Sequence, residues 1–384
     1  MADLDPALVT RARRHATERG ELPGPADLGV MVRDLGGVLG RADLVELGHR
    51  LRAELLGAGP LQPLLDTPGV SDVLVNGPGS VWVDRGRGLE RADVALGDPA
   101  EIRALATRLA AAGGQRLDDA SPVVDARLPD GTRLHAVLPP IAPDGALISL
   151  RVLRGTAFRL EELVACRSLA PPVVDVIRAL VARRANLLVS GATGTGKTTL
   201  LSALLSLVPP TERIVCIEEA SELSPDHPHT LRLLVRRPNV ERAGEVDLAA
   251  LVRTALRMRP DRIVLGECRG QEVREMFTAL NTGHEGGCAT VHANTVHDVP
   301  ARLEALGALA GMSPDAVAVQ AASALDVVLH LRRDAGHRYL AQVGAVSRRG
   351  SALGVDLVLE ADPSGAVRRT AAWPAFAERW AAAR

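Results

Sequence analysis

Residues 187–201 read LLVSGATGTGKTTLL, and this stretch decides the fold. An apolar strand at 187–190 leads into a glycine-rich loop, and a helix follows at 198–207. The pattern G-x-x-x-x-G-K-S/T between a strand and a helix is specific for a P-loop, whose backbone N–H groups surround nucleotide phosphates. The residues predicted to bind the nucleotide are Gly191, Ala192, Thr193, Gly194, Thr195, Gly196, Lys197, Thr198 and Thr199.

Lys197 is the only lysine in the chain, since every other member of the 45 Lys and Arg residues is arginine. A compact ammonium differs from a wide, planar guanidinium, so this position is predicted to contact the β- and γ-phosphates of ATP. Thr198 is predicted to bind Mg²⁺ through its hydroxyl. The alternative is a glycine-rich turn with a chance lysine, which would require neither the strand before the loop nor the helix after it.

Acidic residues follow two further predicted strands, 213–217 and 262–265. Glu218 and Glu219 end the first strand, and Glu267 follows Gly266, where a Walker B strand usually carries aspartate. Ligands of parallel sheets bind at the carboxyl ends of the strands. Glu267 is therefore predicted to orient Mg²⁺ or to activate water, and Glu218 and Glu219 are further catalytic candidates. The alternative for each is a solvated acid at a strand end.

Residues 282–294 place His284 and His292 on either side of a short strand at 288–291. A metal site would need further ligands, and none converge in the sequence. We favour phosphate sensing or coupling between domains, with His292 as a catalytic candidate. The alternative is a histidine that is half-buried for packing reasons.

The rest of the chain predicts an α/β fold in several parts. Short alternating runs at 70–75, 81–83, 126–128, 134–138 and 147–153, with a helix at 99–112, indicate a small α+β domain. Strands and helices alternate from 186 to 291, which is typical of a parallel sheet with crossover helices. A helical stretch at 299–322 and strands near 327–331 and 339–346 follow. The predicted parts are an N-terminal helical segment (1–59), the α+β domain (60–155), a linker (156–172), the P-loop domain (173–360) and a C-terminal tail (361–384).

The composition argues against several classes of partner. Basic and acidic residues number 45 and 46, the net charge is −1, and aromatic residues make up 2%, so neither a basic field nor base stacking favours nucleic acid. The four cysteines form no C-x-x-C pair, which indicates neither a zinc cluster nor a disulfide framework. The start of the chain lacks a signal-peptide pattern, and acidic residues interrupt the apolar stretch 303–331. We expect a cytoplasmic protein with only peripheral membrane association.

Four segments together resemble the motifs of the secretion ATPase superfamily, which powers type II and type IV secretion and type IV pili. Residues 191–199 are similar to its Walker A motif, 213–223 to its Asp box, 257–270 to its Walker B region and 282–294 to its His box. Residues 70–77 and 121–133 resemble the TadA/CpaF branch, which assembles Flp-type tight-adherence pili. The GC-rich composition suggests the actinobacterial, conjugal-transfer-associated type. The resemblance extends over about residues 60–331.

This resemblance implies a homohexameric ring of ATPases with a RecA-like C-terminal domain and an N-terminal domain that completes the ATP site. It also implies an inner-membrane platform protein as partner, at the inner face of the cell membrane. Arg133 and Arg151, with Arg127 beside them, are similar to arginines of the family that face the nucleotide; ordinary surface arginines are the alternative. The Asp box has Glu218-Glu219 where aspartate is common at the second position, which leaves open which acid is the base.

Two other functions fit parts of the sequence. A RecA-like nucleic-acid-translocating ATPase would share the fold, but the neutral charge and scarce aromatic residues oppose it. A nucleotide-gated scaffold that does not hydrolyse ATP would require that Glu218, Glu219 and Glu267 have no catalytic role. The transported substrate, and the choice between pilus assembly and retraction, are open at this point.

Overall fold

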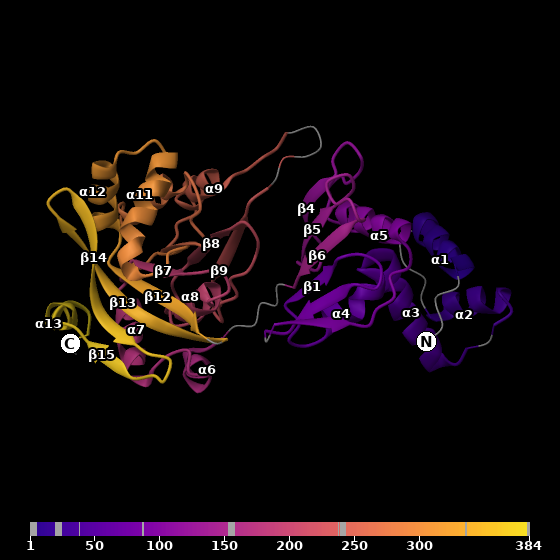
Figure 1. The fold of residues 1–384 in the computed structure, drawn as a ribbon, viewed down its shortest axis with the longest axis horizontal. Helices are drawn as coiled ribbons and strands as arrows, with labels where there is room; N and C mark the ends of the chain where they lie inside the picture. Colours follow the sequence, from indigo (N-terminus) through magenta and orange to yellow (C-terminus); the bar gives the residue numbers. More distant parts are fainter. Residues whose placement is uncertain are drawn as a thin grey trace. The chain divides into compact units, whose positions relative to one another are not determined.

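The computed structural model describes residues 6–19, 25–37, 39–86, 88–152, 158–236, 238, 243–334 and 336–381. The chain divides into two compact units, residues 1–154 and 155–384 (Figure 1). We refer to them as the N-terminal and C-terminal units. Residues 153–157, where the predicted strand 147–153 ends and the predicted linker begins, lie outside the described residues.

The N-terminal unit begins with three helices where the sequence predicts one helical stretch up to residue 59. They are α1 (Pro6–Arg19), α2 (Pro25–Asp34) and α3 (Arg41–Leu56). Prolines occupy the first positions of α1 and α2, where the missing N–H costs least. The three helices share a small apolar core that contains Leu28 and Leu51, so this segment packs on itself.

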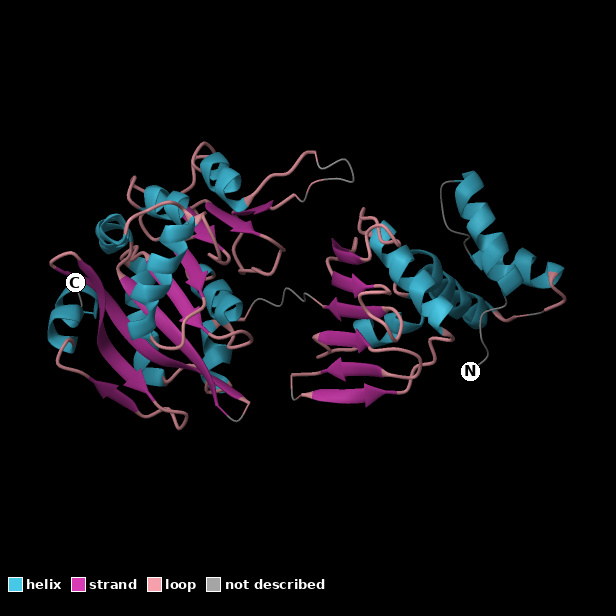
Figure 2. Cartoon of the chain, turned by 45° about the horizontal axis from the view of Figure 1, so that its top comes forward, coloured by secondary structure: helices cyan, strands magenta, loops and turns pink. Residues whose placement is uncertain are grey.

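The rest of the N-terminal unit is an antiparallel sheet with helices on one face (Figure 2). A 3₁₀ turn (Gly59–Leu61) and α4 (Gln62–Asp66) lead into the strands, whose order is β3-β2-β1-β6-β5-β4. Helix α5 (Pro99–Ala112) matches the predicted helix 99–112; Asp98 and Glu101 form a capping box at its start. The strands are β1 (Asp72–Val75), β2 (Val81–Asp84), β3 (Leu89–Ala92), β4 (Val123–Arg127), β5 (Arg133–Val137) and β6 (Leu147–Arg151).

The C-terminal unit is built on a nine-stranded sheet of order β15-β14-β13-β12-β7-β11-β10-β8-β9. From β12 to β9 all neighbours are parallel, as the sequence predicts. From β12 to β15 they are antiparallel, because β13 follows β12 through a tight turn at Gly336. The strands are β7 (Leu187–Gly191), β8 (Ile214–Glu218), β9 (Thr230–Leu234), β10 (Arg262–Leu265), β11 (Cys288–Val291), β12 (Val327–Asp334), β13 (His337–Arg349), β14 (Ala352–Ala361) and β15 (Val367–Arg369).

Helices cover both faces of this sheet, and alternate residues of the buried strands therefore enter two cores. Leu187 and Val189 of β7 pack with the helices of one face, whereas Leu188 packs with those of the other. The first face carries α6 (Leu160–Ala165), α7 (Pro171–Ala182) and α8 (Lys197–Leu205). The second carries α9 (Leu248–Ala255), α10 (Val273–Leu280), α11 (Val299–Leu309) and α12 (Pro314–Ala324).

The predicted helical stretch 299–322 contains two helices, α11 and α12. Gly311 has a φ of +70°, which ends the first helix, and the Ser313 hydroxyl caps the second by accepting from the Ala316 amide. Beyond residue 361, where the sequence gives no clear signal, β15 and α13 (Trp373–Phe376) lead into a short π-helical turn. Phe376 and Trp380 from this region are buried in the α7–α8 core. No described helix has the length and apolarity needed to span a bilayer.

Candidate functional site

The glycine loop lies between β7 and α8, at the carboxyl end of the parallel strands. Gly191 has a φ of +149°, and a Cβ there would lie 2.6 Å from the Leu331 carbonyl oxygen and 2.7 Å from the Thr195 hydroxyl. Only glycine fits this close approach. The Thr195 hydroxyl donates to the Ala192 carbonyl across the loop (2.8 Å). Helix α8 then begins at Lys197, so the positive end of its dipole faces the loop, as in phosphate-binding sites.

Lys197 bends back into this loop. Its Nζ donates to the carbonyl oxygens of Gly191 (2.9 Å) and Ala192 (3.0 Å) and lies 3.3 Å from Nδ1 of His292. The side chain is only 8% exposed. Burial lowers the pKa of the Lys197 ammonium below its usual value, although the nearby Glu267 opposes this shift. Phosphate oxygens are stronger acceptors than carbonyls, so a triphosphate has an ammonium already held in the loop to bind.

Glu267, on the segment after β10, continues this chain of polar contacts. Its Oε1 lies 2.7 Å from Nε2 of His292 on the far side of the ring from Lys197. Its Oε2 accepts from the Arg269 guanidinium at 2.7 Å. Burial favours the neutral acid, but Arg269, His292 and Lys197 outweigh it and lower the pKa of Glu267. Glu267 is therefore a carboxylate at neutral pH, connected through His292 to the P-loop lysine.

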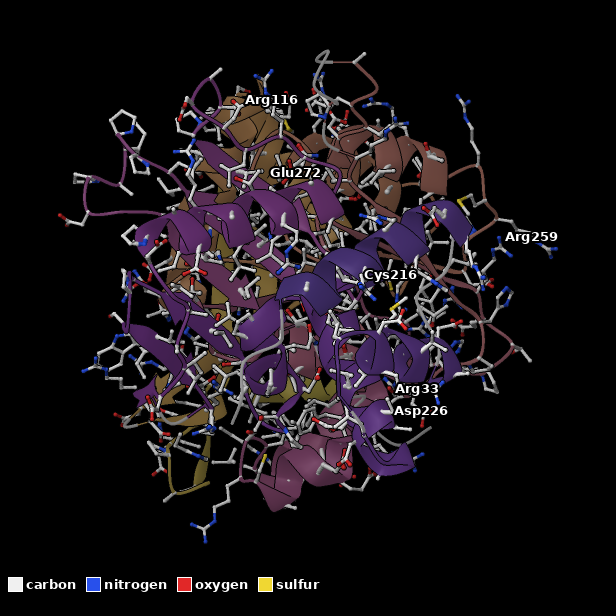
Figure 3. All side chains as sticks on the ribbon, turned by 90° about the vertical axis from the view of Figure 1, so that its right-hand side faces the viewer. Arg33, Arg116, Cys216, Asp226, Arg259 and Glu272 are labelled. Carbon is white, nitrogen blue, oxygen red and sulfur yellow. The ribbon has the colours of Figure 1, made fainter. Side chains whose placement is uncertain are left out.

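Arg269 is a site residue that the sequence interpretation did not select. It bridges Glu267 and Glu219, whose Oε2 lies 3.5 Å away. The buried Glu272, labelled in Figure 3, fixes the backbone here, because its Oε1 accepts from the amides of Arg269 and Gly270. Its position two residues after Glu267 was the feature of the sequence from which Arg269 could have been selected.

Glu218 differs from Glu267 in its surroundings. It is 3% exposed at the end of β8, and burial raises its pKa to about 7. Its Oε1 accepts from the amides of Glu222 (2.9 Å) and Leu223 (2.8 Å), and within the described residues its buried Oε2 has no hydrogen-bond partner. A Cβ on Gly266 would lie 2.9 Å from the Glu218 Cγ. Gly266 thus makes room for the acid of the neighbouring strand, and Glu267 is not the only acid at this edge.

Glu222 is a second residue that the sequence interpretation did not select. The Thr198 hydroxyl donates to its Oε2 at 3.4 Å. Thr198 and Glu222 thus offer a hydroxyl and a carboxylate where Mg²⁺ is predicted, and hard oxygen ligands of this kind suit that ion. Among the described residues no group of three or more His, Cys, Asp or Glu side chains is arranged to hold a metal. The protein oxygens thus fit an ion that is shared with phosphates.

The turn between β12 and β13 adds arginines beside the loop. Arg333 and Arg338 are opposite each other in the hairpin, and both side chains are exposed. The Arg333 guanidinium lies 3.9 Å from a Cβ built on Gly194, and the Arg338 side chain lies 3.9 Å from one built on Gly196. Sequence periodicity places such residues on strands but does not reveal that the hairpin extends past the P-loop.

Arg133 and Arg151 lie in the N-terminal unit, where they form a cluster with Arg127. In the register of the sheet Arg133 of β5 faces Arg127 of β4 on one side and Arg151 of β6 on the other. Like charges at directly opposite positions destabilise a sheet. Asp72 of β1 faces Arg151 from the other side. The structure thus brings together the three arginines that the sequence interpretation singled out.

His284 has a different environment from His292. Its Nδ1 lies 3.1 Å from the Ala279 carbonyl at the end of α10, a contact that fits a structural role. Three of the four cysteines, Cys216, Cys268 and Cys288, are buried, and all four are free.

A glycine loop on a helix N-terminus, a buried lysine and acids on adjacent parallel strands define the class of P-loop ATPases. The chain belongs to the Type II/IV secretion system protein family, which it matches over residues 54–356. It is 51% identical over 316 residues to a Mycobacterium tuberculosis protein named as a conjugal transfer protein, with 80% of this chain and 90% of that protein covered.

Two further comparisons agree with this family. The chain is 30% identical over 284 residues to the conjugal transfer protein TrbB of Rhizobium radiobacter, and the aligned region covers 73% of this chain and 84% of TrbB. Its fold is similar to that of the pilus retraction motor PilT with bound ADP, with a TM-score of 0.50, 20% identity, and coverage of 77% of this chain and 81% of that structure. The protein is thus an ATPase of the Type II/IV secretion family.

Proposed function

We propose that the protein is a hexameric motor of the TadA/CpaF type, which couples ATP hydrolysis to pilus assembly or protein secretion. The contact series Arg269–Glu267–His292–Lys197 carries this proposal. It connects the P-loop to the ends of β10 and β11, so a change at the γ-phosphate is transmitted to the neighbouring strands. Residues 70–77 and 121–133, which resemble the TadA/CpaF branch, support the assignment to that type.

The loop residues 191–199 hold the triphosphate in this proposal. Lys197 binds the β- and γ-phosphate oxygens, and Thr198 with Glu222 and Glu267 fits Mg²⁺, which neutralises the developing phosphate charge when bound. Arg333 and Arg338 are close enough to the loop to add positive charge from the same chain. Together these residues bind and orient the substrate.

The carboxylates of Glu218 and Glu267 take different roles in this proposal. A general base works best when its pKa is near the ambient pH, and the pKa of Glu218 is about 7. We assign the proton from the attacking water to Glu218, whose Oε2 has a free lone pair among the described residues. Glu267 stays ionised and orients water or metal. Glu219 is exposed and interacts with Arg269, so it has the smallest role.

We further propose that the arginine cluster of the N-terminal domain acts on the nucleotide. Three guanidinium groups on neighbouring strands concentrate positive charge, since Arg133 faces Arg127 and Arg151, and this charge favours an anion as an additional partner. In this proposal residues 60–155 form a moving domain, 156–172 a linker and 173–360 the RecA-like ATPase domain. Movement of the cluster toward the γ-phosphate would couple hydrolysis to work.

The partners proposed for this motor are five further copies of the chain and an inner-membrane platform protein, at the cytoplasmic face of the membrane. Relatives named for conjugal transfer and type IV secretion support a role in such a machine. Phosphate release from ATP by the purified chain, measured with light scattering of the same sample, tests the proposal. Magnesium-dependent turnover by a hexamer is the expected result. A monomer that binds ATP without turnover, or stimulation by single-stranded DNA, would contradict it.

A further inference from the structure

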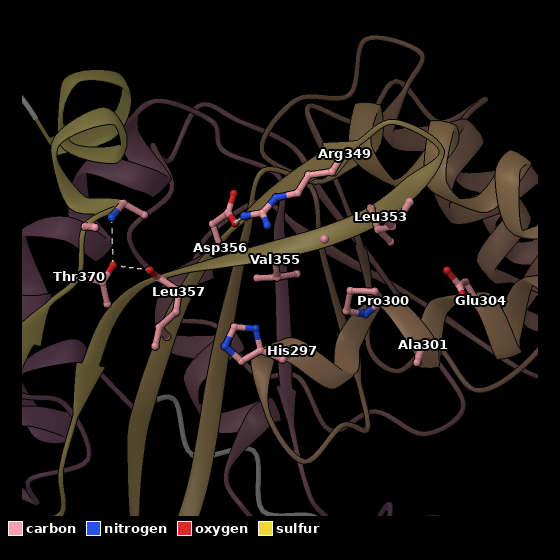
Figure 4. Close-up of a pocket in the computed structure, with 14 residues that line it drawn as sticks. His297, Pro300, Ala301, Glu304, Arg349, Leu353, Val355, Asp356, Leu357 and Thr370 are labelled. Carbon is pink, nitrogen blue, oxygen red and sulfur yellow. Dashed lines mark hydrogen bonds and ion pairs between the residues drawn. The ribbon is translucent and has the colours of Figure 1, made fainter.

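A groove in the C-terminal unit is separate from the residues assigned to ATP. It lies between β14 and α11 and has a volume of about 920 Å³ (Figure 4). Residues 352–357 of β14 form one side, and residues 370–372 lie beside Leu357 at one end. His297, Pro300, Ala301 and Glu304 line the opposite side. The groove thus follows the edge of a strand along the surface of a helix.

The β14 edge in this groove has backbone groups without a strand partner. The Val346 amide donates to Asp326, away from β14, so Ala345 and Ser347 face β14 and pair with Asp356 and Gly354. Leu353 and Val355 alternate with Gly354 and Asp356 along β14, so their backbone N–H and C=O groups point away from β13, toward the groove.

Strand β15 does not cover this part of the edge, because it pairs only with Leu359 to Ala361. The Leu357 carbonyl accepts from the Thr370 hydroxyl. Within the described residues, the outward backbone groups of Leu353 and Val355 have no partner in the protein. The free edge therefore presents the donors and acceptors of two alternate residues, which are about 7 Å apart at about 3.3 Å per residue.

The helix side of the groove carries a single uncompensated charge. His297, Ala301 and Glu304 are four and three residues apart, so they share one face of the helical segment. Arg349 and Asp356, on the strand side, neutralise each other in an ion pair of 2.5 Å. Glu304 forms no ion pair with any described residue. A basic side chain is its natural complement.

We propose that this groove binds an extended segment of a partner protein, which adds a strand to β14 and places a basic side chain against Glu304. Backbone amides and carbonyls at strand spacing are matched by another extended backbone, whereas a helix has already used its own. The small Ala301 leaves space at the centre of the helix side for a peptide side chain. Residues 370–372, which close one end, lie beyond the residues 54–356 that the family model matches.

Peptides are the probe for this proposal. Peptides that bind the full chain are selected from a random-sequence library. The selected peptides are then synthesised, and their affinity for the chain is measured by fluorescence anisotropy. We expect a recurrent basic residue flanked by alternating small apolar residues. N-methylation of every second residue of the peptide should weaken binding about tenfold per site, whereas methylation of the residues between should have little effect, because only alternate amides face β14.

Charge reversal tests the placement of the basic residue. Glu304→Arg should weaken the basic peptide at least about fivefold, and a peptide with glutamate at that position should regain affinity. Asp144→Arg, at an exposed acid in the other unit, is the matched control and should leave binding unchanged. Glu304→Arg should also keep ATP turnover, so the result is independent of the proposed motor function.

Amide hydrogen exchange locates the peptide. In the free chain, Leu353 and Val355 should exchange faster than Gly354 and Asp356, and the peptide should protect the first pair. Peptide binding that ignores both Glu304 and the position of N-methylation would overturn the proposal. Protection of Leu353 and Val355 that increases with chain concentration, without peptide, would show that a second copy occupies the edge and would overturn it as well.

Discussion

The two sheets of the molecule differ in how their charged side chains are arranged. At the carboxyl edge of the C-terminal sheet, two cations, Lys197 and Arg269, lie on either side of His292 and the Glu267 carboxylate, and each group contacts the next within 3.3 Å. In the N-terminal sheet, Arg127, Arg133 and Arg151 face one another across adjacent strands. Opposite charges in contact stabilise the C-terminal site, whereas like charges on adjacent strands favour the binding of an anion. If the proposed function holds, binding of the γ-phosphate and the response to it can be separated by mutation.

The largest effect is expected at the lysine. Lys197→Ala should abolish ATP hydrolysis, because the loop loses its only ammonium and the chain has no other lysine. Lys197→Arg should fail too, since a guanidinium is too wide for a loop in which Gly191 is already in close contact. Phosphate release measures this, with circular dichroism as the control for folding. Near wild-type turnover of either variant would remove the P-loop assignment.

The next largest effect on turnover is expected from loss of the arginine cluster, and ATP binding should be unaffected. Arg133→Ala or Arg151→Ala is expected to slow turnover by on the order of 10³, as for arginine fingers, with little change in ATP affinity. Thermal unfolding of each variant is the control for folding. Arg91→Ala on β3 of the same sheet is the matched control.

Mixing tests the origin of the arginine. Hexamers formed from an arginine variant and a Lys197→Ala variant should recover part of the activity if the guanidinium acts on a neighbouring subunit. Full activity in every single arginine variant would instead leave the cluster as an ordinary surface feature.

Substitution of the acids is expected to reduce turnover less, and the size of each reduction distinguishes the roles of the three residues. Glu267→Gln and Glu218→Gln should each reduce turnover by on the order of 10² while ATP affinity is kept. Glu219→Gln should cost only a few-fold, since this side chain is exposed. Single-turnover assays and nucleotide titration distinguish these outcomes. A collapse of ATP affinity in Glu267→Gln would make that residue structural, and a larger loss in Glu219→Gln would transfer the role of base.

The smallest effect is one of pH. Because the folded pKa of Glu218 is raised from 4.5 to about 7, its contribution to stability is complete below pH 4.5 and is lost as pH rises through 7. The loss is at most about 3 kcal/mol. Glu218→Gln should flatten this dependence in denaturant unfolding between pH 5 and 8. The turnover of the parent should rise through pH 7, and an unchanged profile in the variant would rule out Glu218 as the base.

Much of the site could be predicted because parallel strands bring distant residues to one edge. The P-loop, Glu218 and Glu267 follow strands whose continuous apolar runs are clear in the sequence, and β7, β8 and β10 are found at those runs. Glu222 and Arg333 were missed because their contacts depend on loop conformation and on how far a hairpin extends. Strand β14 was also missed, although Leu353, Val355 and Leu357 alternate with Gly354 and Asp356 as in a half-buried strand.

The solitary lysine makes the nucleotide loop chemically addressable. A reagent that acylates side-chain amines, such as a succinimidyl ester, can modify only Lys197 among the side chains of this chain. The amine is buried and held by two carbonyls, so its reaction rate reports on opening of the loop. Bound nucleotide should shield it, and the modified tryptic fragment would lack a cleavage at that position. The wild-type protein thereby contains its own single-site footprinting probe of loop occupancy.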